Sequence, residues 1–173
     1  LYNNTVGNYN NAIGEFSLVK DSWRDKDVWY YVDAEYATSA KNIFGNTPEM
    51  LEFYSTILDY PYPWAKYHQV VVKDFVSGAM ENTTAVIHGD FVQLTDRELL
   101  DESHEDVIAH ELFHHWFGDL VTCESWSQLT LNEGFATYGE YLWKEHKYGL
   151  ESARHHFQAD LKAYLSEASY SPK

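Results

Sequence analysis

The chain has 173 residues, of which 45% are hydrophobic and 17% aromatic, so its composition excludes a disordered segment and suffices for one folded domain. Its 27 Asp and Glu residues exceed the 12 Lys and Arg residues, and the formal charge of -15 argues against nucleic acid or an anionic membrane as a partner. Cys123 is the only cysteine, which excludes an intrachain disulfide, and the absence of a signal pattern or an apolar membrane-length stretch leaves the compartment undetermined.

Strands dominate the first half of the chain. Residues 1–12 are rich in Asn, Tyr and Gly, a composition that predicts a loop. Segments rich in β-branched and aromatic residues, bounded by turn signals, predict strands at 13–20, 28–32, 67–75 and 85–87. The charged residues 24–27 are expected to form the turn between the first two strands.

Two helices are expected between the second and third strands. Helical spacing begins near Ala34 and is interrupted at Gly45. Thr47 then starts a second helix as its N-cap, with Pro48 at the first helical position. This helix should end near Asp59, because the prolines that follow disfavour helical backbone.

Helices dominate the second half. Ser103 and Asp106 predict a capping box at the start of a helix that ends at Gly118. The helices expected from here on are residues 103–118, 132–147 and 151–167, with Gly149 between the last two. Strands followed by helices predict an α+β fold, and we expect a single domain over residues 1–173 without internal repeats.

The helix predicted at 103–118 carries the sequence His-Glu-Leu-Phe-His at residues 110–114. Positions i and i+4 share one helix face, so His110 and His114 can direct their imidazoles at one point. With the carboxylate of Glu133 they form the three-ligand set of a catalytic zinc, which leaves a fourth position for water. Glu111, about 100° around the helix from His110, can take a proton from that water as it attacks a carbonyl. This set predicts one Zn²⁺ per chain and a metallopeptidase site.

The sequence around this motif supports a buried site. From Val107 to Phe117 every residue is apolar except Glu111 and three histidines. A helix that is apolar nearly all round is buried, and burying these polar groups is unfavourable unless something such as a metal compensates. The alternative is a core helix whose histidines bond to the backbone.

Together with a second motif, these residues resemble peptidase family M1, the zinc aminopeptidases with a thermolysin-like catalytic domain. The metal signature of that family is His-Glu-x-x-His, eighteen residues and Glu, and here residues 115–132 separate His114 from Glu133. The second hallmark, Gly-Ala-Met-Glu-Asn, is intact at residues 78–82. Further matching segments lie at 62–63, 116–118 and 132–136, and the likeness covers roughly residues 35–145.

The resemblance implies roles for these motifs. The three residues that correspond to zinc ligands are His110, His114 and Glu133, and Glu111 corresponds to the general base. Glu81 falls on the carboxylate that binds the free α-amine of the substrate, with Asn82 beside it in the motif. The backbone of Gly78, Ala79 and Met80 falls where a bound peptide lies as an added strand. A carboxylate that holds an ammonium sets the distance from the chain end to the scissile bond, so peptides with a free N-terminus are the expected substrates.

Other side chains receive less specific expectations. Glu140 lies seven residues after Glu133 on a predicted helix and can accept the other ring N–H of His110, the alternative being a solvated carboxylate. Where the family usually has Gln and Asn, this chain has His115 and Asp119, and we expect His115 to be a polar core or interface residue. The histidines expected at the surface are His104, His155 and His156, and the aromatic residues expected in the core are Trp126, Tyr138 and Tyr141.

The resemblance also implies missing parts. M1 enzymes use a downstream Tyr to stabilise the oxyanion, and the 40 residues after Glu133 (173 minus 133) hold none at that place. The N-terminal β-domain and the C-terminal helices of the family are missing as well. We therefore expect a truncated catalytic domain whose partners are peptides and the flanking domains. Two alternatives stay open, a thermolysin-like endopeptidase, against which Glu81 argues, and a metal-binding or peptide-binding fragment that is inactive in isolation.

Overall fold

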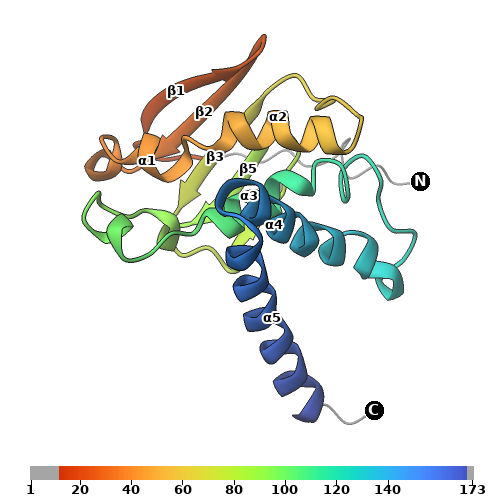
Figure 1. Cartoon of the computed structure of the whole chain (residues 1–173). Helices are drawn as coiled ribbons and strands as arrows, with labels where there is room; N and C mark the ends of the chain where they lie inside the picture. Colours follow the sequence, from red (N-terminus) through yellow and green to blue (C-terminus); the bar gives the residue numbers. More distant parts are fainter. Residues whose placement is uncertain (1–11, 171–173) are drawn as a thin grey trace.

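A computed structural model describes residues 12–170, so the loop predicted at residues 1–12 lies almost wholly outside the described residues. Within them, a five-stranded sheet belongs to the first half of the chain and the long helices α4 and α5 to the second (Figure 1). This arrangement confirms the predicted α+β fold, with a strand-rich N-terminal half and a helical C-terminal half.

The sheet has the strand order β1-β2-β3-β5-β4, so β4 forms one of its edges. The outer pairs are antiparallel, whereas β2, β3 and β5 run parallel to one another. The strands are β1 (Ser17–Trp23), β2 (Lys26–Val32), β3 (Tyr67–Val72), β4 (Ala79–Met80) and β5 (Ala85–Gly89).

The first hairpin differs from its prediction. The first strand covers Ser17–Trp23 instead of 13–20, and Trp23 pairs with Lys26 across a turn of two residues. Lys26 and Asp27 therefore belong to β2 and not to the turn. Alternate side chains of both strands point to solvent, so charged residues fit within the hairpin, and Arg24 supplies the left-handed backbone of the turn with a φ of 53°.

All five predicted helical regions form, with shifted ends. The helices are α1 (Ala40–Phe44), α2 (Thr47–Ile57), α3 (Glu105–Phe113), α4 (Glu133–Tyr148) and α5 (Leu150–Tyr170). Short 3₁₀ helices lie at Ala34–Tyr36, Asp90–Val92, Glu98–Leu100 and Trp126–Leu131. Among the helices of residues 12–170, none combines the length and the apolar character needed to cross a membrane.

Both predicted N-caps are wrong. Thr47 lies inside α2, after the N-cap Asn46, and its hydroxyl accepts a hydrogen bond of 2.9 Å from Gln69 Nε2 of the sheet. The hydroxyl of Ser103 accepts a hydrogen bond from the backbone N of Glu105 at 3.3 Å, but His104 is the N-cap of α3. In each case a tertiary contact or a one-residue shift replaces the local cap.

Helix α3 ends at Phe113, before the predicted end at Gly118. The N–H groups of His115 and Trp116 bond to carbonyls three residues back, at 3.1 and 3.0 Å, so the chain tightens into 3₁₀-type turns. At Gly118 φ is 149°, and a Cβ there would lie 3.0 Å from Nδ1 of His114. Glycine therefore lets the chain turn closely against the ring of His114.

A glycine also sets the distance between α3 and α4. A Cβ at Gly139 would lie 2.5 Å from Cγ of Phe113, closer than any real contact, so only glycine allows this approach. The carbonyl of Gly139 accepts a hydrogen bond of 2.8 Å from the buried Tyr54 hydroxyl, which ties α4 to α2. The hydrophobic core lies between the sheet and these helices, with Trp143 and Ile108 among its buried members.

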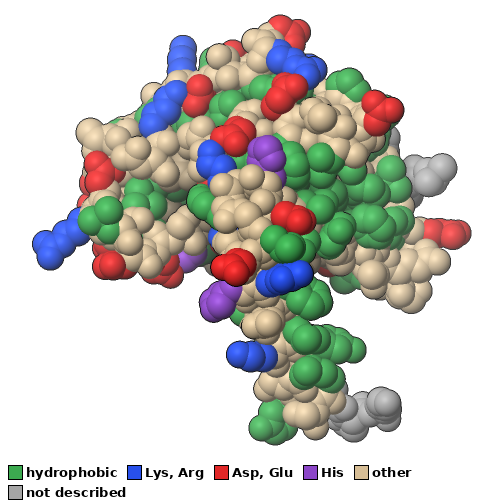
Figure 2. Space-filling model, in the orientation of Figure 1, with side chains coloured by type: hydrophobic (Ala, Val, Ile, Leu, Met, Phe, Trp, Pro, Cys, Tyr) green, Lys and Arg blue, Asp and Glu red, His purple; other side chains and the backbone are tan. Residues whose placement is uncertain are grey.

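Helix α5 extends away from the sheet and the other helices. It runs downward from the end of α4 and extends beyond the rest of the molecule (Figure 1). Only its first turns pack against α4, and hydrophobic side chains gather along one side of its free part (Figure 2). The exposed hydrophobic residues of α5 include Phe157, Tyr164 and Leu165.

Candidate metal centre

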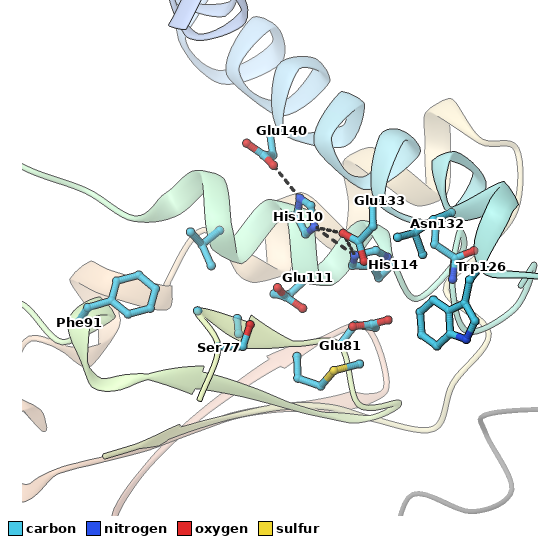
Figure 3. A pocket seen from close by; sticks show the side chains of 15 residues that line it. Ser77, Glu81, Phe91, His110, Glu111, His114, Trp126, Asn132, Glu133 and Glu140 are labelled. Atoms are coloured by element: carbon cyan, nitrogen blue, oxygen red, sulfur yellow. Dashed lines mark hydrogen bonds and ion pairs between the residues drawn. The ribbon is translucent and has the colours of Figure 1, made fainter. Parts of the chain in front are cut away.

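Helices α3 and α4 bring two imidazoles and a carboxylate to one point (Figure 3). The Nε2 atoms of His110 and His114 are 3.0 Å apart. Glu133, the first residue of α4, has its Oε2 atom 3.2 Å from the first of these nitrogens and 3.4 Å from the second. The structure thus brings together the three residues that the sequence predicts as metal ligands.

The other nitrogen of each ring is already engaged with an acceptor. Nδ1 of His110 lies 2.6 Å from Oε1 of Glu140, and Nδ1 of His114 lies 3.0 Å from the carbonyl oxygen of Phe117. Because a carboxylate and a carbonyl only accept, both Nδ1 atoms carry the hydrogen in the neutral rings. In the neutral rings both Nε2 atoms then present lone pairs toward the carboxylate oxygen of Glu133, so the three atoms form a donor set for a cation, whose place a proton on one nitrogen takes when no metal is bound.

The spacing of the three atoms fits a zinc ion. Histidine nitrogens and carboxylate oxygens bind tetrahedral zinc at about 2.0–2.1 Å, which separates neighbouring ligand atoms by roughly 3.3 Å. The observed separations of 3.0, 3.2 and 3.4 Å straddle that value. The donor atoms of His110, His114 and Glu133 therefore fit a zinc ion in both their chemical type and their spacing.

Contacts between His110, Glu133 and Glu140 shift the pKa values of these side chains. Burial alone would lower the pKa of His110, but its hydrogen bonds with Glu133 and Glu140 outweigh burial and raise that pKa to about 10. The same histidine contacts hold the pKa of Glu133 well below its usual range. Glu133 is thus charged at neutral pH, the state that a metal ligand requires, and binding of a metal would displace the proton of His110.

Glu111 lies beside the three donor atoms, on the side of α3 that faces Glu81 (Figure 3). It is only 6% exposed, and among the described residues its Oε2 atom has no hydrogen-bond partner. Burial raises the pKa of this carboxyl to about 7, against the opposing effect of His110 and His114. A carboxyl with a pKa near neutrality can both accept and release a proton.

A cleft of about 510 Å³ runs past these groups. One wall consists of α3 and α4, and the other of residues 77–81, which include β4. The strand β4 pairs with β5 through Ala79 and Met80, and as a sheet edge it leaves its other side toward the cleft. Asn82 is not among the lining residues; it is 8% exposed and its carbonyl oxygen bonds to Ala85 N at 2.8 Å.

Three expectations about side-chain burial made from the sequence are wrong. Tyr138, expected in the core, is 54% exposed on α4. Trp126, expected in the core, is 86% exposed and lies on the cleft wall (Figure 3). His156, expected at the surface, is half-buried, and its Nε2 atom lies 2.8 Å from Oε2 of Glu140. A signal for His156 exists in the helical spacing, because it lies three residues after the fully buried Ala153. His115 is buried as predicted, with Nδ1 at 2.8 Å from the Tyr62 hydroxyl.

The cleft also has lining residues for which no role is predicted from the sequence. Those that share the cleft with the predicted groups include Ser77, Phe91, Val107 and Leu129. They come from four separate segments, so no local motif joins them.

Comparisons with known proteins find similarity to one family of peptidases. The family model described as "Peptidase family M1 domain" matches residues 43–171. Aminopeptidase N of Canis lupus familiaris is 46% identical over 100 residues, which is 56% of this chain and 10% of that protein. Aminopeptidase N of Homo sapiens is 41% identical over 119 residues, or 66% of this chain and 12% of that protein. Aminopeptidase M1 of Arabidopsis thaliana is 36% identical over 136 residues, which is 76% of this chain and 16% of that protein. The chain thus spans 10% to 16% of the length of these relatives.

Proposed function

The chain belongs to peptidase family M1, and from this premise we propose that it carries the zinc-dependent centre of an aminopeptidase that removes N-terminal residues from peptides. The observation that carries the proposal is the convergence of His110, His114 and Glu133, with Glu111 beside them in one cleft. Since the chain covers only part of the length of its relatives, the activity is proposed for the protein that contains the other parts of the active site.

His110, His114 and Glu133 would hold the zinc ion, whose Lewis acidity supports attack of water on a peptide carbonyl. Glu111 would accept the proton of the attacking water and pass it to the leaving amine. A buried carboxyl with a pKa of about 7 is suited both to accept the proton from water and to release it to the amine. Glu140 would keep His110 in the tautomer that leaves Nε2 free to bind, through the contact of 2.6 Å.

The opposite wall would bind the substrate. Glu81 lines the cleft and faces Glu111, and its carboxylate would hold the α-ammonium of the peptide (Figure 3). The exposed backbone of Gly78, Ala79 and Met80 would pair with the peptide as one more strand of the sheet, as edge strands do. An added Cβ at Gly78 would meet only the ring of Phe91 at 4.0 Å, so packing does not require glycine there. Close approach of the substrate backbone would explain why glycine occupies position 78.

We further propose that the described residues form one unit of the catalytic domain. The sheet and the helices α1, α2, α3 and α4 share one hydrophobic core, and the ligands come from helices inside it. Completion of the active site by other parts of the protein is consistent with the share of the relatives that the chain covers.

Zinc content and substrate choice together test this function. The protein should bind one zinc ion per chain and hydrolyse an amino-acid amide or a short peptide with a free N-terminus. It should leave the same peptide intact once the amine is acetylated, because Glu81 then has no ammonium to bind. Equal cleavage of both peptides would favour a thermolysin-like endopeptidase, and zinc binding without turnover would favour the fragment that only binds metal.

A further inference from the structure

His156 connects the last helix to the candidate metal centre. Its Nε2 atom lies 2.8 Å from Oε2 of Glu140, while the other carboxylate oxygen of Glu140 lies 2.6 Å from Nδ1 of His110. A line of contacts thus runs from α5 through α4 to α3. We propose that His156 is a positioning residue that acts through Glu140 on the ligand His110, an inference that rests on the proposed zinc centre.

The chemistry of Glu140 shows why a second partner matters. A carboxylate turns easily about its last side-chain bond, so a single hydrogen bond leaves the direction of its lone pairs loosely defined. Only 13% of the side chain of Glu140 is exposed, so water can do little to hold it. With one oxygen bonded to His156 and the other to His110, the carboxylate plane has a single orientation. That orientation keeps the His110 ring aimed at Glu133.

The position of His156 is itself fixed by its surroundings. Asp160, one helical turn further along α5, lies 3.5 Å from the same Nε2 atom, and Asp106 of α3 completes the group of acids around the ring. The side chain of His156 is only 16% exposed. The Nε2–H group thus donates to Glu140 and has two further carboxylates nearby, which favours a ring held in this orientation.

Zinc affinity tests the inference directly. The full chain would be titrated with zinc in competition with a chromophoric chelator, for the unaltered protein and for His156→Leu. We expect His156→Leu to weaken zinc binding about three- to tenfold, less than the 10- to 100-fold typical of residues that contact a ligand directly. His155→Leu is the matched control, because His155 is the neighbouring exposed histidine of the same helix, and it should leave the affinity unchanged.

Two further comparisons separate positioning from a general effect on folding. His156→Gln keeps an N–H at nearly the position of Nε2 and should restore the affinity, whereas His156→Asn is too short and should not. This pair stays informative even where the leucine variant unfolds, which circular dichroism would reveal. In a Glu140→Gln background, His156→Leu should have no additional effect on zinc affinity, because the two residues act in series.

The possible outcomes distinguish this inference from the proposed function. A loss of less than threefold in both His156→Leu and His156→Asn would overturn the inference and leave the zinc centre standing. The same holds for an undiminished effect of His156→Leu in the Glu140→Gln background. A second zinc ion per chain that disappears with His156 would also overturn it, since His156 would then be a ligand. No zinc binding by the unaltered chain would overturn the proposed function, and this inference with it.

Discussion

The two walls of the cleft are built in opposite ways. The metal wall, defined here as His110, His114 and Glu133, stands on packed helices, and both of its histidine rings have partners on both nitrogens. The substrate wall, defined as residues 77–81, contains a strand of only two residues at a sheet edge. The first wall is fixed before anything binds, whereas the second offers free backbone. Changes in the metal wall should therefore affect every substrate, and changes in the substrate wall should affect only substrates that it recognises.

Loss of a ligand should have the largest effect. His114→Ala removes one of three donor atoms and leaves a cavity, because the side chain of His114 is only 2% exposed. We expect zinc affinity to fall by on the order of a thousandfold or more, and hydrolysis to fall with it for all substrates. Zinc titration and peptide hydrolysis measure both quantities. Zinc binding at the original affinity would show that the zinc ligands lie elsewhere in the protein.

Glu111→Gln should separate chemistry from metal binding. Glutamine has the same shape but cannot accept a proton, and Glu111 is not one of the three converging donors. We expect kcat to fall by about 10²–10⁴ while zinc content stays near one per chain. Any residual cleavage of the acetylated peptide should fall by the same factor as cleavage of the free peptide, since the proton transfer is common to both. A variant that keeps substantial activity would show that another group is the base.

Glu81→Gln should act on the substrate wall alone. It removes the charge opposite the α-ammonium, an interaction that contributes about 1.5–3 kcal/mol, so kcat/KM for a free-amine peptide should fall roughly 10- to 150-fold. Zinc affinity should not change. Any residual cleavage of an acetylated peptide should also stay the same, and an equal loss for both peptides would contradict the role of Glu81 as an amine anchor.

The sequence predicts the metal ligands better than the residues that hold those ligands in place, and the reason is physical. The spacing of His110 and His114 is a local property of a helix, and the residues of β4 belong to one continuous motif. The approach of Glu133 depends on how closely α3 and α4 pack, which the helical spacing alone does not determine. His156 reaches Glu140 across 16 residues and two helices, and no local pattern marks that contact.

The other errors of sequence prediction have the same origin. Thr47 has the residue type and the following proline of an N-cap, yet its hydroxyl bonds to Gln69 of a strand that comes later in the chain. Trp126 has the size of a core residue but lies at the cleft, where its segment is a 3₁₀ helix with an irregular residue at Gln128. Local signals predict elements well, and tertiary contacts decide which side chains they leave free.

Two glycines offer a test of the packing difference between the walls. Gly139→Ala forces a Cβ to within 2.5 Å of Phe113 and should destabilise the fold by about 1–3 kcal/mol as α3 and α4 move apart. Gly78→Ala meets no close neighbour and should change stability by less than about 0.5 kcal/mol. It should nevertheless lower kcat/KM if the peptide backbone lies against it. Urea unfolding and peptide hydrolysis check the pair, and equal stability losses would contradict the contrast.

A further effect should appear in the pH dependence of stability, through a histidine beneath the substrate wall. His88 of β5 pairs with Ala79, is fully buried, and bonds through Nε2 to Gln69 Oε1 at 2.9 Å. Gln69 Nε2 donates to the Thr47 hydroxyl, so Oε1 must accept from His88. The ring therefore carries its hydrogen on Nε2, and its Nδ1 has no partner among the described residues. Burial without a carboxylate lowers the pKa of His88 to about 3, the opposite of the shift at His110.

Stability should therefore fall as the solution becomes acidic. In the unfolded chain His88 gains a proton near pH 6.5, whereas in the folded protein it stays neutral down to about pH 3. Between these values the unfolded state binds the extra proton, so His88 reduces the free energy of unfolding by up to about 1.4 kcal/mol per pH unit. His88→Gln keeps a donor toward Gln69 but cannot titrate, so its stability should fall less steeply between pH 6 and pH 4 in urea unfolding. The exposed His155→Gln should keep the original slope, and the same slope in all three proteins would show that His88 is protonated inside the fold.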